Sequence, residues 1–156
     1  MKIELKNIKT LKAMSEETQC FTATVYIDGS KAGTVRNSGH GGCNEYHPTS
    51  LGQRLDDYAK TLPADVVFGM TIQPDADSVI GKVYQREAVK RELTSLMARK
   101  IVFIRDGEMR SIKCDSTVQR DTWLASPQLP GLVKGGAILN LMPLDDAAAL
   151  AETCGL

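Results

Sequence analysis

The chain has 156 residues, 42% of them hydrophobic and 24% charged, which is the composition of a globular protein rather than a disordered one. Lysine plus arginine and aspartate plus glutamate are equal at 19 each, so the formal net charge is zero. A protein that binds duplex DNA mainly through its phosphates needs a surplus of positive charge, so nucleic acid is not expected as the primary partner. The length fits one compact domain over residues 1–156.

Nothing in the sequence predicts export or insertion into a membrane. No apolar segment follows the basic start of the chain, and no stretch reaches the ~20 apolar residues of a membrane helix. The four cysteines are scattered without a CxxC pair, at Cys20, Cys43, Cys114 and Cys154. We therefore expect a cytoplasmic protein with reduced thiols, and no pattern in the chain points to a cofactor.

Two strands joined by a tight turn are predicted in the N-terminal part of the chain. Residues 2–11 alternate as a strand, and residues 20–27 alternate more clearly. The core-facing side chains of the second strand are Phe21, Ala23, Val25 and Ile27. Asp28-Gly29 follows directly and favours a two-residue hairpin turn, because both turn positions require a positive φ. The returning strand spans residues 31–37.

The middle of the chain is predicted to hold two helices with a strand between them. Either Thr49 or Ser50 can cap the first helix, and Pro63 stops it. Residues 64–73 are rich in apolar and β-branched side chains, and they predict a buried strand. The longest helix then runs from residue 77 or 78 to about residue 100, with apolar side chains along one face.

A second hairpin is predicted over residues 100–114, with Asp106-Gly107 at its turn. Shorter elements follow in chain order: a helix at 118–125, a loop at 126–131, a strand at 135–142 and a helix at 145–152. Because strands and helices do not alternate as βαβ units, the expected fold class is α+β. We expect an antiparallel or mixed sheet built around the two β-hairpins, with two to four helices packed on it.

The segment that could carry chemistry is a glycine-rich loop, residues 38–47, between a strand and a helix. Glycine frees backbone N–H groups and a helix N-terminus attracts anions, so this context is typical of a phosphate-binding loop. The lysine and spacing of a Walker motif are missing, so the pattern does not indicate nucleotide hydrolysis. The candidate ligand-binding residues are Arg36, Gly39, His40, Gly41, Gly42, Cys43, Asn44 and His47.

The same loop allows other interpretations. Its His-x2-Cys-x3-His spacing, formed by His40, Cys43 and His47, offers zinc ligands, although a fourth ligand would have to come from elsewhere in the chain. Cys43 beside a histidine could also act as a nucleophile. The pattern favours a structural connection whose glycines form turns and whose histidines face water, so no catalytic residue and no metal ligand is assigned.

The segment EETQCFTATVYIDGSKAGTVRNSGHGGCNEY, residues 16–46, resembles the N-terminal part of a family of small proteins of bacteria and their phages. KGGAILNLMP near the C-terminus is weakly similar to the end of the same proteins. The resemblance carries over no catalytic residue. It implies a cytoplasmic protein encoded by a phage or mobile element, and such proteins commonly bind and inhibit host machinery or sequester a small signal.

The sequence therefore favours a function by binding over a function by catalysis. The leading hypothesis is a non-enzymatic binding protein whose partner is a host protein or protein complex, such as a host defence system that it inhibits. The second hypothesis is a small-molecule binder that holds an anionic, nucleotide-like ligand at residues 39–44. The third is an enzyme or metalloprotein that uses His40, Cys43 and His47.

Overall fold

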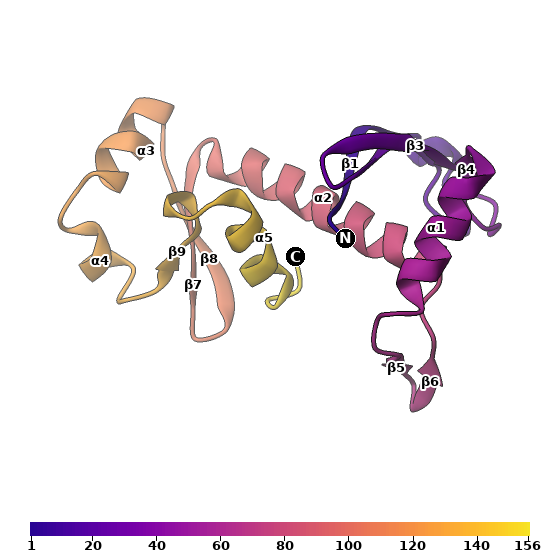
Figure 1. Ribbon diagram of the computed structural model, residues 1–156. Helices are drawn as coiled ribbons and strands as arrows, with labels where there is room; N and C mark the ends of the chain where they lie inside the picture. The colour runs from indigo at the N-terminus through magenta and orange to yellow at the C-terminus, as the bar shows by residue number, and fades with distance from the viewer. The chain divides into compact units, whose positions relative to one another are not determined.

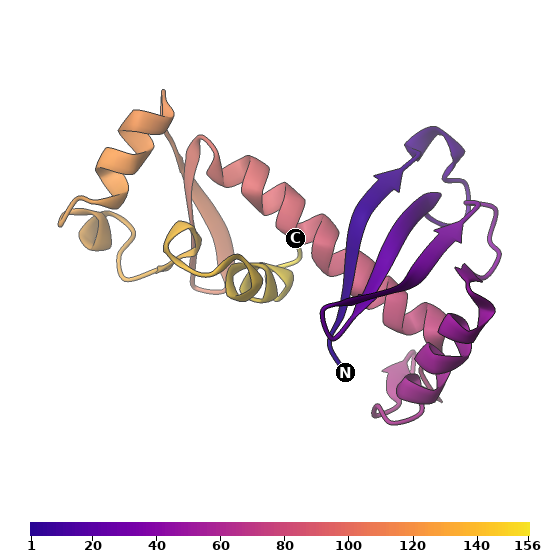
Figure 2. The ribbon, with the colours of Figure 1, turned by 45° about the horizontal axis from the view of Figure 1, so that its top comes forward.

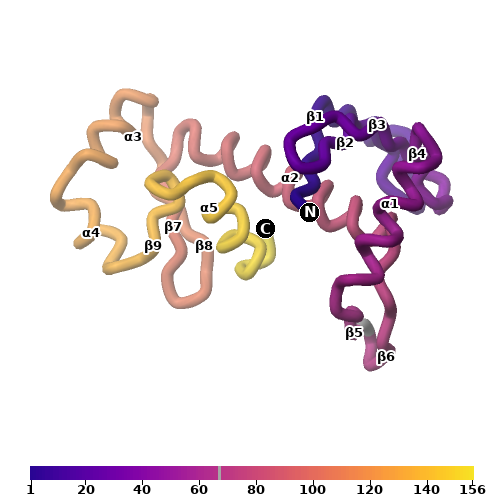
Figure 3. The backbone as a smooth tube through the Cα atoms, in the orientation of Figure 1, coloured from indigo at the N-terminus to yellow at the C-terminus, as the bar shows by residue number. Residues whose placement is uncertain are grey.

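The computed structural model describes residues 1–156, apart from the side chain of Val67 (Figure 3). The fold is α+β, as predicted, and the strand pairs of the described chain are antiparallel. The chain divides into two compact units, Met1–Tyr84 and Gln85–Leu156. The two predicted hairpins lie in different sheets, one in each unit, rather than in one sheet. The single domain expected from the length stays a prediction.

The first unit is built on a four-stranded sheet whose strands follow the chain order (Figure 1). These strands are β1 (Ile3–Thr10), β2 (Phe21–Ile27), β3 (Ser30–Asn37) and β4 (Glu45–His47). The other elements are the 3-10 turn η1 (Lys12–Met14), helix α1 (Thr49–Ala59), strands β5 (Asp65–Val67) and β6 (Met70–Ile72), and the first part of helix α2 (Ala76–Met97). The sheet, α1 and α2 share one core, in which Val25, Leu55 and Ile80 are fully buried.

The turn of the first hairpin is as predicted. Asp28 has φ 50° and Gly29 has φ 81°, and the register pairs Ile27 with Ser30. The alternation of β2 is also confirmed, because its predicted core residues are all buried and the residues between them are exposed or half-buried. The pairing shifts by one residue between Val25–Gly33 and Tyr26–Lys31, so the turn fixes the register only up to this bulge, and the alternation of β2 itself decides which face packs on the core.

Residues 64–73 do not form the single buried strand that the sequence predicts. They form a short hairpin, in which β5 and β6 pair around a turn at Phe68 and Gly69. Apart from Val67, whose side chain is not described, its large apolar side chains are exposed: Val66, Phe68, Met70 and Ile72. The prediction is wrong because an apolar run indicates burial only where another element covers it, and because Gly69 interrupts the run with a turn.

Two helix starts differ from the prediction. Helix α1 begins at Thr49 without a side-chain cap, so neither Thr49 nor Ser50 caps it. Helix α2 begins at Ala76, slightly before the expected start, because Asp75 caps it. The Asp75 carboxylate accepts a hydrogen bond from the Ser78 N–H at 2.8 Å. Both helices otherwise lie in the predicted segments.

The second unit contains the second predicted hairpin. Strands β7 (Lys100–Arg105) and β8 (Glu108–Lys113) are joined by Asp106 and Gly107, both at positive φ. Besides the last part of α2, its helices are α3 (Thr117–Leu124), the one-turn α4 (Leu129–Leu132) and α5 (Leu144–Glu152). The described chain thus holds five α-helices, more than the two to four expected, because α4 lies in a segment predicted as a loop.

The last predicted strand is shorter than expected. Strand β9 spans only Ala137–Ile138 and is followed by the 3-10 turn η2 (Leu139–Leu141). The Asn140 side chain takes the place of the rest of the strand. Its Oδ1 accepts a hydrogen bond from the Val102 N–H at 2.7 Å, and its Nδ2 donates to the Lys100 carbonyl at 3.0 Å. One amide side chain therefore continues the pairing at this edge of β7.

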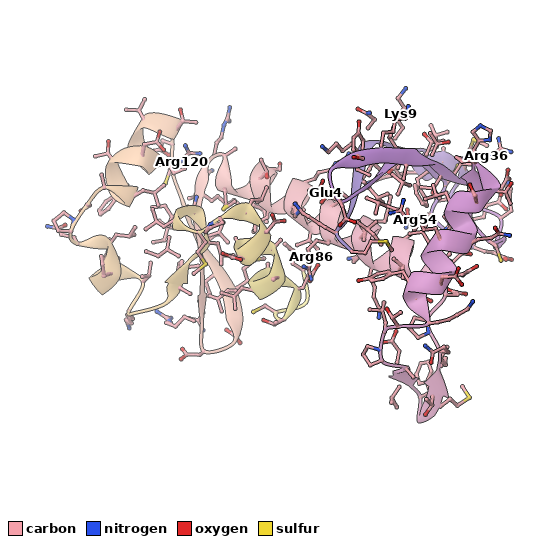
Figure 4. All side chains as sticks on the ribbon, in the orientation of Figure 1. Glu4, Lys9, Arg36, Arg54, Arg86 and Arg120 are labelled. Carbon is pink, nitrogen blue, oxygen red and sulfur yellow. The ribbon has the colours of Figure 1, made fainter. Side chains whose placement is uncertain are left out.

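Helix α2 is the longest helix, and its C-terminal end is capped by a side chain from α3. Arg120, labelled in Figure 4, donates hydrogen bonds from Nη1 to the carbonyl oxygens of Met97 and Ala98 at 2.8 and 2.9 Å. A cation at this end also meets the negative pole of the helix dipole. Neither α2 nor any other helix in the described chain is long and apolar enough to cross a membrane.

Candidate functional site

The glycine-rich loop begins where β3 ends, at the buried residue Asn37, which is 8% exposed. The Asn37 Oδ1 accepts hydrogen bonds from the Thr18 hydroxyl at 2.7 Å and from the Gly39 N–H at 2.9 Å. The Asn37 Nδ2 donates to the Gly42 carbonyl and to the Asn44 Oδ1, both at 3.0 Å. One side-chain amide thus holds both ends of the loop.

The Gly39 carbonyl connects the loop by hydrogen bonds to the segment that precedes β2. Its oxygen accepts hydrogen bonds from the N–H groups of Glu16, Glu17 and Thr18 at 3.0, 3.0 and 3.3 Å. Gly39 has φ 89°, and a Cβ built on it would lie 2.1 Å from the Met14 carbonyl oxygen. A side chain does not fit here, so the fold itself accounts for this glycine.

The backbone N–H groups predicted to bind an anion already donate hydrogen bonds within the protein. The hypothesis needs the N–H groups of Gly39 and Gly41 for a phosphate, but they donate to the side chains of Asn37 and Thr18. The loop also does not run directly into a helix, because the three residues of β4 lie between the loop and α1. The helix dipole that favours an anion is therefore not adjacent to the loop.

The two basic candidates, Arg36 and His40, lie against carboxylates. Arg36 donates hydrogen bonds from Nε and Nη2 to the Glu45 Oε2 at 2.8 and 2.6 Å, across the β3–β4 pair. The His40 Nδ1 lies 3.1 Å from the Glu16 Oε2. Both pairs are exposed, so each contributes little to stability, and each carboxylate places a negative charge where an anionic ligand would bind.

His40, Cys43 and His47 do not gather at one point. His40 faces Glu16, His47 lies in β4 opposite Thr34, and Cys43 is exposed. Within the part of the chain that the structure describes, no three His, Cys, Asp or Glu side chains form a group that could hold a metal ion. The zinc interpretation of the spacing therefore finds no ligand group there.

A cavity of about 370 Å³ opens beside the loop. Its lining includes the ring of Phe21 and two exposed apolar side chains, Leu11 at 56% and Met14 at 48% exposure. Lys9 and Arg36, both labelled in Figure 4, also line the cavity, together with Glu45, the carboxylate that pairs with Arg36. The sequence identified Arg36 and His40 among the lining residues but not the cavity itself, because its lining comes from segments whose closeness leaves no pattern in the sequence.

A second polar cluster connects the end of the loop with α2. The Tyr46 hydroxyl donates a hydrogen bond to the Asp77 Oδ1 at 2.6 Å, and the Asp77 Oδ2 accepts one from the Asn44 N–H at 3.1 Å. Burial of the phenol and, second, its hydrogen bond to Asp77 raise the pKa of Tyr46 far above its ordinary value of 10.0. Nothing in the sequence spacing links Tyr46 with Asp77, so this pair was not predicted.

Replacement of Tyr46 by Phe should destabilise the fold by about 1–2 kcal/mol, because the Asp77 carboxylate loses a donor. It should also change the response to alkali. Above about pH 10 the unfolded chain releases the Tyr46 proton while the folded protein keeps it, so the stability of the wild type falls as the pH rises. Urea denaturation followed by circular dichroism from about pH 8 to about pH 11 should show a shallower loss in the variant. Equal slopes would assign the alkaline loss to other groups.

The β5–β6 hairpin displays apolar side chains to solvent and projects beyond α1 in Figure 1. Phe68 is 98% exposed and occupies the first position of its turn. In the two hairpins that the sequence predicts, Asp28 and Asp106 hold this position. Val66 and Met70 are 73% and 61% exposed. The apolar character of this segment is evident in the sequence, but its exposure is not.

Comparisons with protein-family models, with curated proteins and with solved structures gave no match. The resemblance of residues 16–46 to small bacterial and phage proteins therefore stays a prediction, and the function has to follow from the geometry of the chain itself.

Proposed function

We propose that this protein is a non-enzymatic binding protein that docks on a protein partner through the β5–β6 hairpin. The observation that carries the proposal is the 98% exposure of Phe68 at the tip of that hairpin. Val66 and Met70 expose further apolar surface on the same element. Single exposed apolar residues are ordinary, whereas a group of them on one projecting element is typical of an interaction site.

The turn chemistry adds a second argument. A two-residue turn with positive φ at both positions suits Asn, Asp and Gly, and it strains a bulky side chain. Asp28 and Asp106 hold the first turn position in the other two hairpins, at φ 50° and 57°. Phe68 holds it here at φ 49°, with a strain of about 1–2 kcal/mol. Because the ring of Phe68 is exposed, burial does not offset this strain in the free protein. Burial of the ring against a partner would offset it.

The chemistry of the hairpin suits a protein surface. Phe and Met are enriched at the centres of protein interfaces, where they enter apolar pockets. The resemblance of residues 16–46 to small bacterial and phage proteins makes a bacterial host protein, including a component of a host defence system, the partner to test first. A contact of this size would be weak or transient unless other surfaces join it.

Affinity capture from a bacterial lysate tests the proposal, with Phe68→Asp as the matched variant. Asp restores the turn chemistry of the other hairpins, so Phe68→Asp should fold at least as stably as the wild type. We expect a protein that the wild type retains and that Phe68→Asp loses. When that protein is used as the bait, it should retrieve the wild type and not the variant.

The control for this capture is Val118→Asp, which introduces the same charge at an apolar residue of α3 that is 74% exposed. This variant should retain the same protein as the wild type. Identical protein sets from the wild type and Phe68→Asp would count against the hairpin as the contact element.

The small-molecule hypothesis has one supporting observation, the cavity that Arg36 and His40 help to line. A thermal-shift screen with mono-, di- and cyclic nucleotides tests it. A nucleotide at 100 times its Kd should stabilise the fold by roughly 2.7 kcal/mol. Arg36→Gln should reduce that stabilisation, because it removes a positive charge from the cavity lining and leaves the Glu45 carboxylate there without its partner. No shift with any nucleotide would remove this hypothesis.

A further inference from the structure

The cavity beside the glycine-rich loop has a lining that suits one class of small molecule. We infer that this cavity binds an amphipathic monocarboxylate, which joins one carboxylate group to an apolar part the size of an aromatic ring or a medium-length alkyl chain. The inference goes beyond the proposed function, because it concerns the cavity and not the β5–β6 hairpin. It also names a ligand class that differs from the nucleotides considered above.

The cavity lies at the end of the four-stranded sheet where β1 stops and β2 starts, and Figure 2 shows η1 beyond this end. Strand pairing places four polar lining residues in one row across the sheet: Lys9, Thr22, Arg36 and Glu45. Residues directly opposite one another point to the same face of a sheet. This row is on the face away from the core, because Phe21 and Ala23, the neighbours of Thr22 on the other face, are buried.

The part of the lining beyond the row is apolar. Leu11 and Met14, from the segment that forms η1, are 56% and 48% exposed. A single exposed apolar residue is ordinary, but here two of them line the same cavity. The apolar part of a ligand that fills the cavity would remove their side chains from water. Each CH₂ group buried in this way should tighten binding about 4-fold.

The lining contains one cation without a carboxylate partner. Arg36 and Glu45 both line the cavity and pair with each other at 2.6 Å, so their charges offset one another. Lys9 is exposed and forms no ion pair within the described chain, so the lining is left with the positive charge of Lys9. A ligand with one negative charge matches this lining. A nucleotide phosphate brings about −1.5 to −2 at pH 7 and meets the Glu45 carboxylate.

The volume of the cavity also favours a small ligand. At about 370 Å³ the cavity lies at the lower end of the roughly 300–1,000 Å³ of typical ligand pockets. Because a water molecule takes up about 30 Å³ of the liquid, the cavity has room for about a dozen water molecules. Octanoate and phenylpropanoate have a similar number of heavy atoms, whereas a nucleotide is larger.

An NMR titration of the full chain with octanoate and with phenylpropanoate tests the inference. We expect the backbone amide signals of Leu11, Met14 and Ser38 to shift and to saturate, with a Kd of about 1 mM or lower. Binding should tighten about 4-fold per CH₂ from butanoate to octanoate. It should weaken from about 50 mM to about 500 mM salt. Octanol, which lacks the charge, should bind about 2- to 5-fold more weakly than octanoate.

Substitutions separate the charged part of the site from the apolar part. Lys9→Met removes the charge and keeps an unbranched side chain, so it should weaken octanoate binding about 2- to 5-fold and leave octanol unaffected. Lys31→Met makes the same change at an exposed residue of β3 outside the lining, and should bind octanoate like the wild type. Leu11→Ala should weaken the binding of both compounds. If Leu11→Ala does not fold, as judged by circular dichroism, Met14→Ala replaces it.

A fourth variant should act in the opposite direction. Glu45→Gln removes the carboxylate from the lining and leaves Arg36 without its partner, so octanoate should bind about 2- to 5-fold more tightly. Damage to the structure of the cavity would weaken binding instead, so weaker binding to Glu45→Gln would count against the inference.

Four other outcomes would overturn the inference. These are no saturable shift with either carboxylate up to about 10 mM, equal binding of octanol and octanoate, unchanged octanoate binding by Lys9→Met, and tighter binding of a nucleotide at the same amides. The last outcome would support the nucleotide hypothesis. Phe68→Asp should bind octanoate like the wild type, because Phe68 is not in the lining, so this result is independent of whether the hairpin docks on a protein.

Discussion

Replacement of Gly39 by Ala is expected to destabilise the protein by about 2–5 kcal/mol, although it adds a single methyl group. An L-residue at φ 89° is strained by about 1–2 kcal/mol. The new Cβ would also lie 2.1 Å from the Met14 carbonyl oxygen and 2.9 Å from the Cys20 Cβ. Because one obstacle is backbone, the loop itself has to move, and this adds a cost of about 1–3 kcal/mol. The movement would weaken the hydrogen bonds from Glu16 and Glu17 to the Gly39 carbonyl.

Gly42 of the same loop provides the matched control. A Cβ on Gly42 would meet no atom within 4 Å, and its φ does not lie in the left-handed region. Gly42→Ala should therefore change the free energy of unfolding by no more than about 0.5 kcal/mol. Urea denaturation followed by circular dichroism compares the two variants. Small and equal effects would show that the loop is not held against Met14.

Truncation of Asn37 to Ala is expected to cost about 2–4 kcal/mol. The Gly39 N–H would lose its acceptor in a buried position, and the Thr18 hydroxyl would lose its partner. Each buried polar group left without a partner costs about 1–3 kcal/mol. The Gly42 carbonyl and the Asn44 amide are nearer to solvent, so water can replace the Asn37 donor for them and limits the loss.

Two further variants define what the Asn37 amide does. Asn37→Asp keeps the accepting oxygen but points a carboxylate oxygen at the Gly42 carbonyl and the Asn44 Oδ1, so it should be no more stable than Asn37→Ala. The exposed neighbour Ser38 serves as the control, and Ser38→Ala should be nearly neutral. Wild-type stability for Asn37→Asp in the same urea experiment would mean that the donor half of the amide is not needed.

The two hairpins with Asp-Gly turns and the long helices could be predicted because local chemistry decides them. Asp28-Gly29 and Asp106-Gly107 adopt the positive φ values that their turns require. The whole β7–β8 register follows from its turn, whereas the β2–β3 register follows only as far as the bulge beside Tyr26. The alternation of β2 and the helical spacing in α1 and α2 locate the core faces. The start of α2 was misplaced only because Asp75, rather than the residues after it, supplies the cap.

The exposed hairpin and the role of the glycine-rich loop could not be predicted, because both depend on what each segment contacts. The apolar run around Phe68 has the pattern of a buried strand, and only the tertiary structure shows that its side chains are exposed. Gly39 and Gly41 would suit an anion site equally well in the sequence. Their contacts with Met14 and Thr18 join segments more than twenty residues apart, and such contacts leave no local signature.

The pairing of β7 with the Asn140 side chain bears on how the chain avoids aggregation. An unpaired strand edge can recruit a strand from another molecule, above all when the strand is apolar and β-branched, as Ile101 and Val102 are. The Asn140 amide occupies the Val102 N–H and the Lys100 carbonyl, where β9 no longer reaches them. A side-chain amide, unlike a strand, offers no further row of backbone N–H and C=O groups to pair with, so no further strand is added at this edge. Until η2 forms and brings Asn140 to this edge, the edge is open to a strand of another chain.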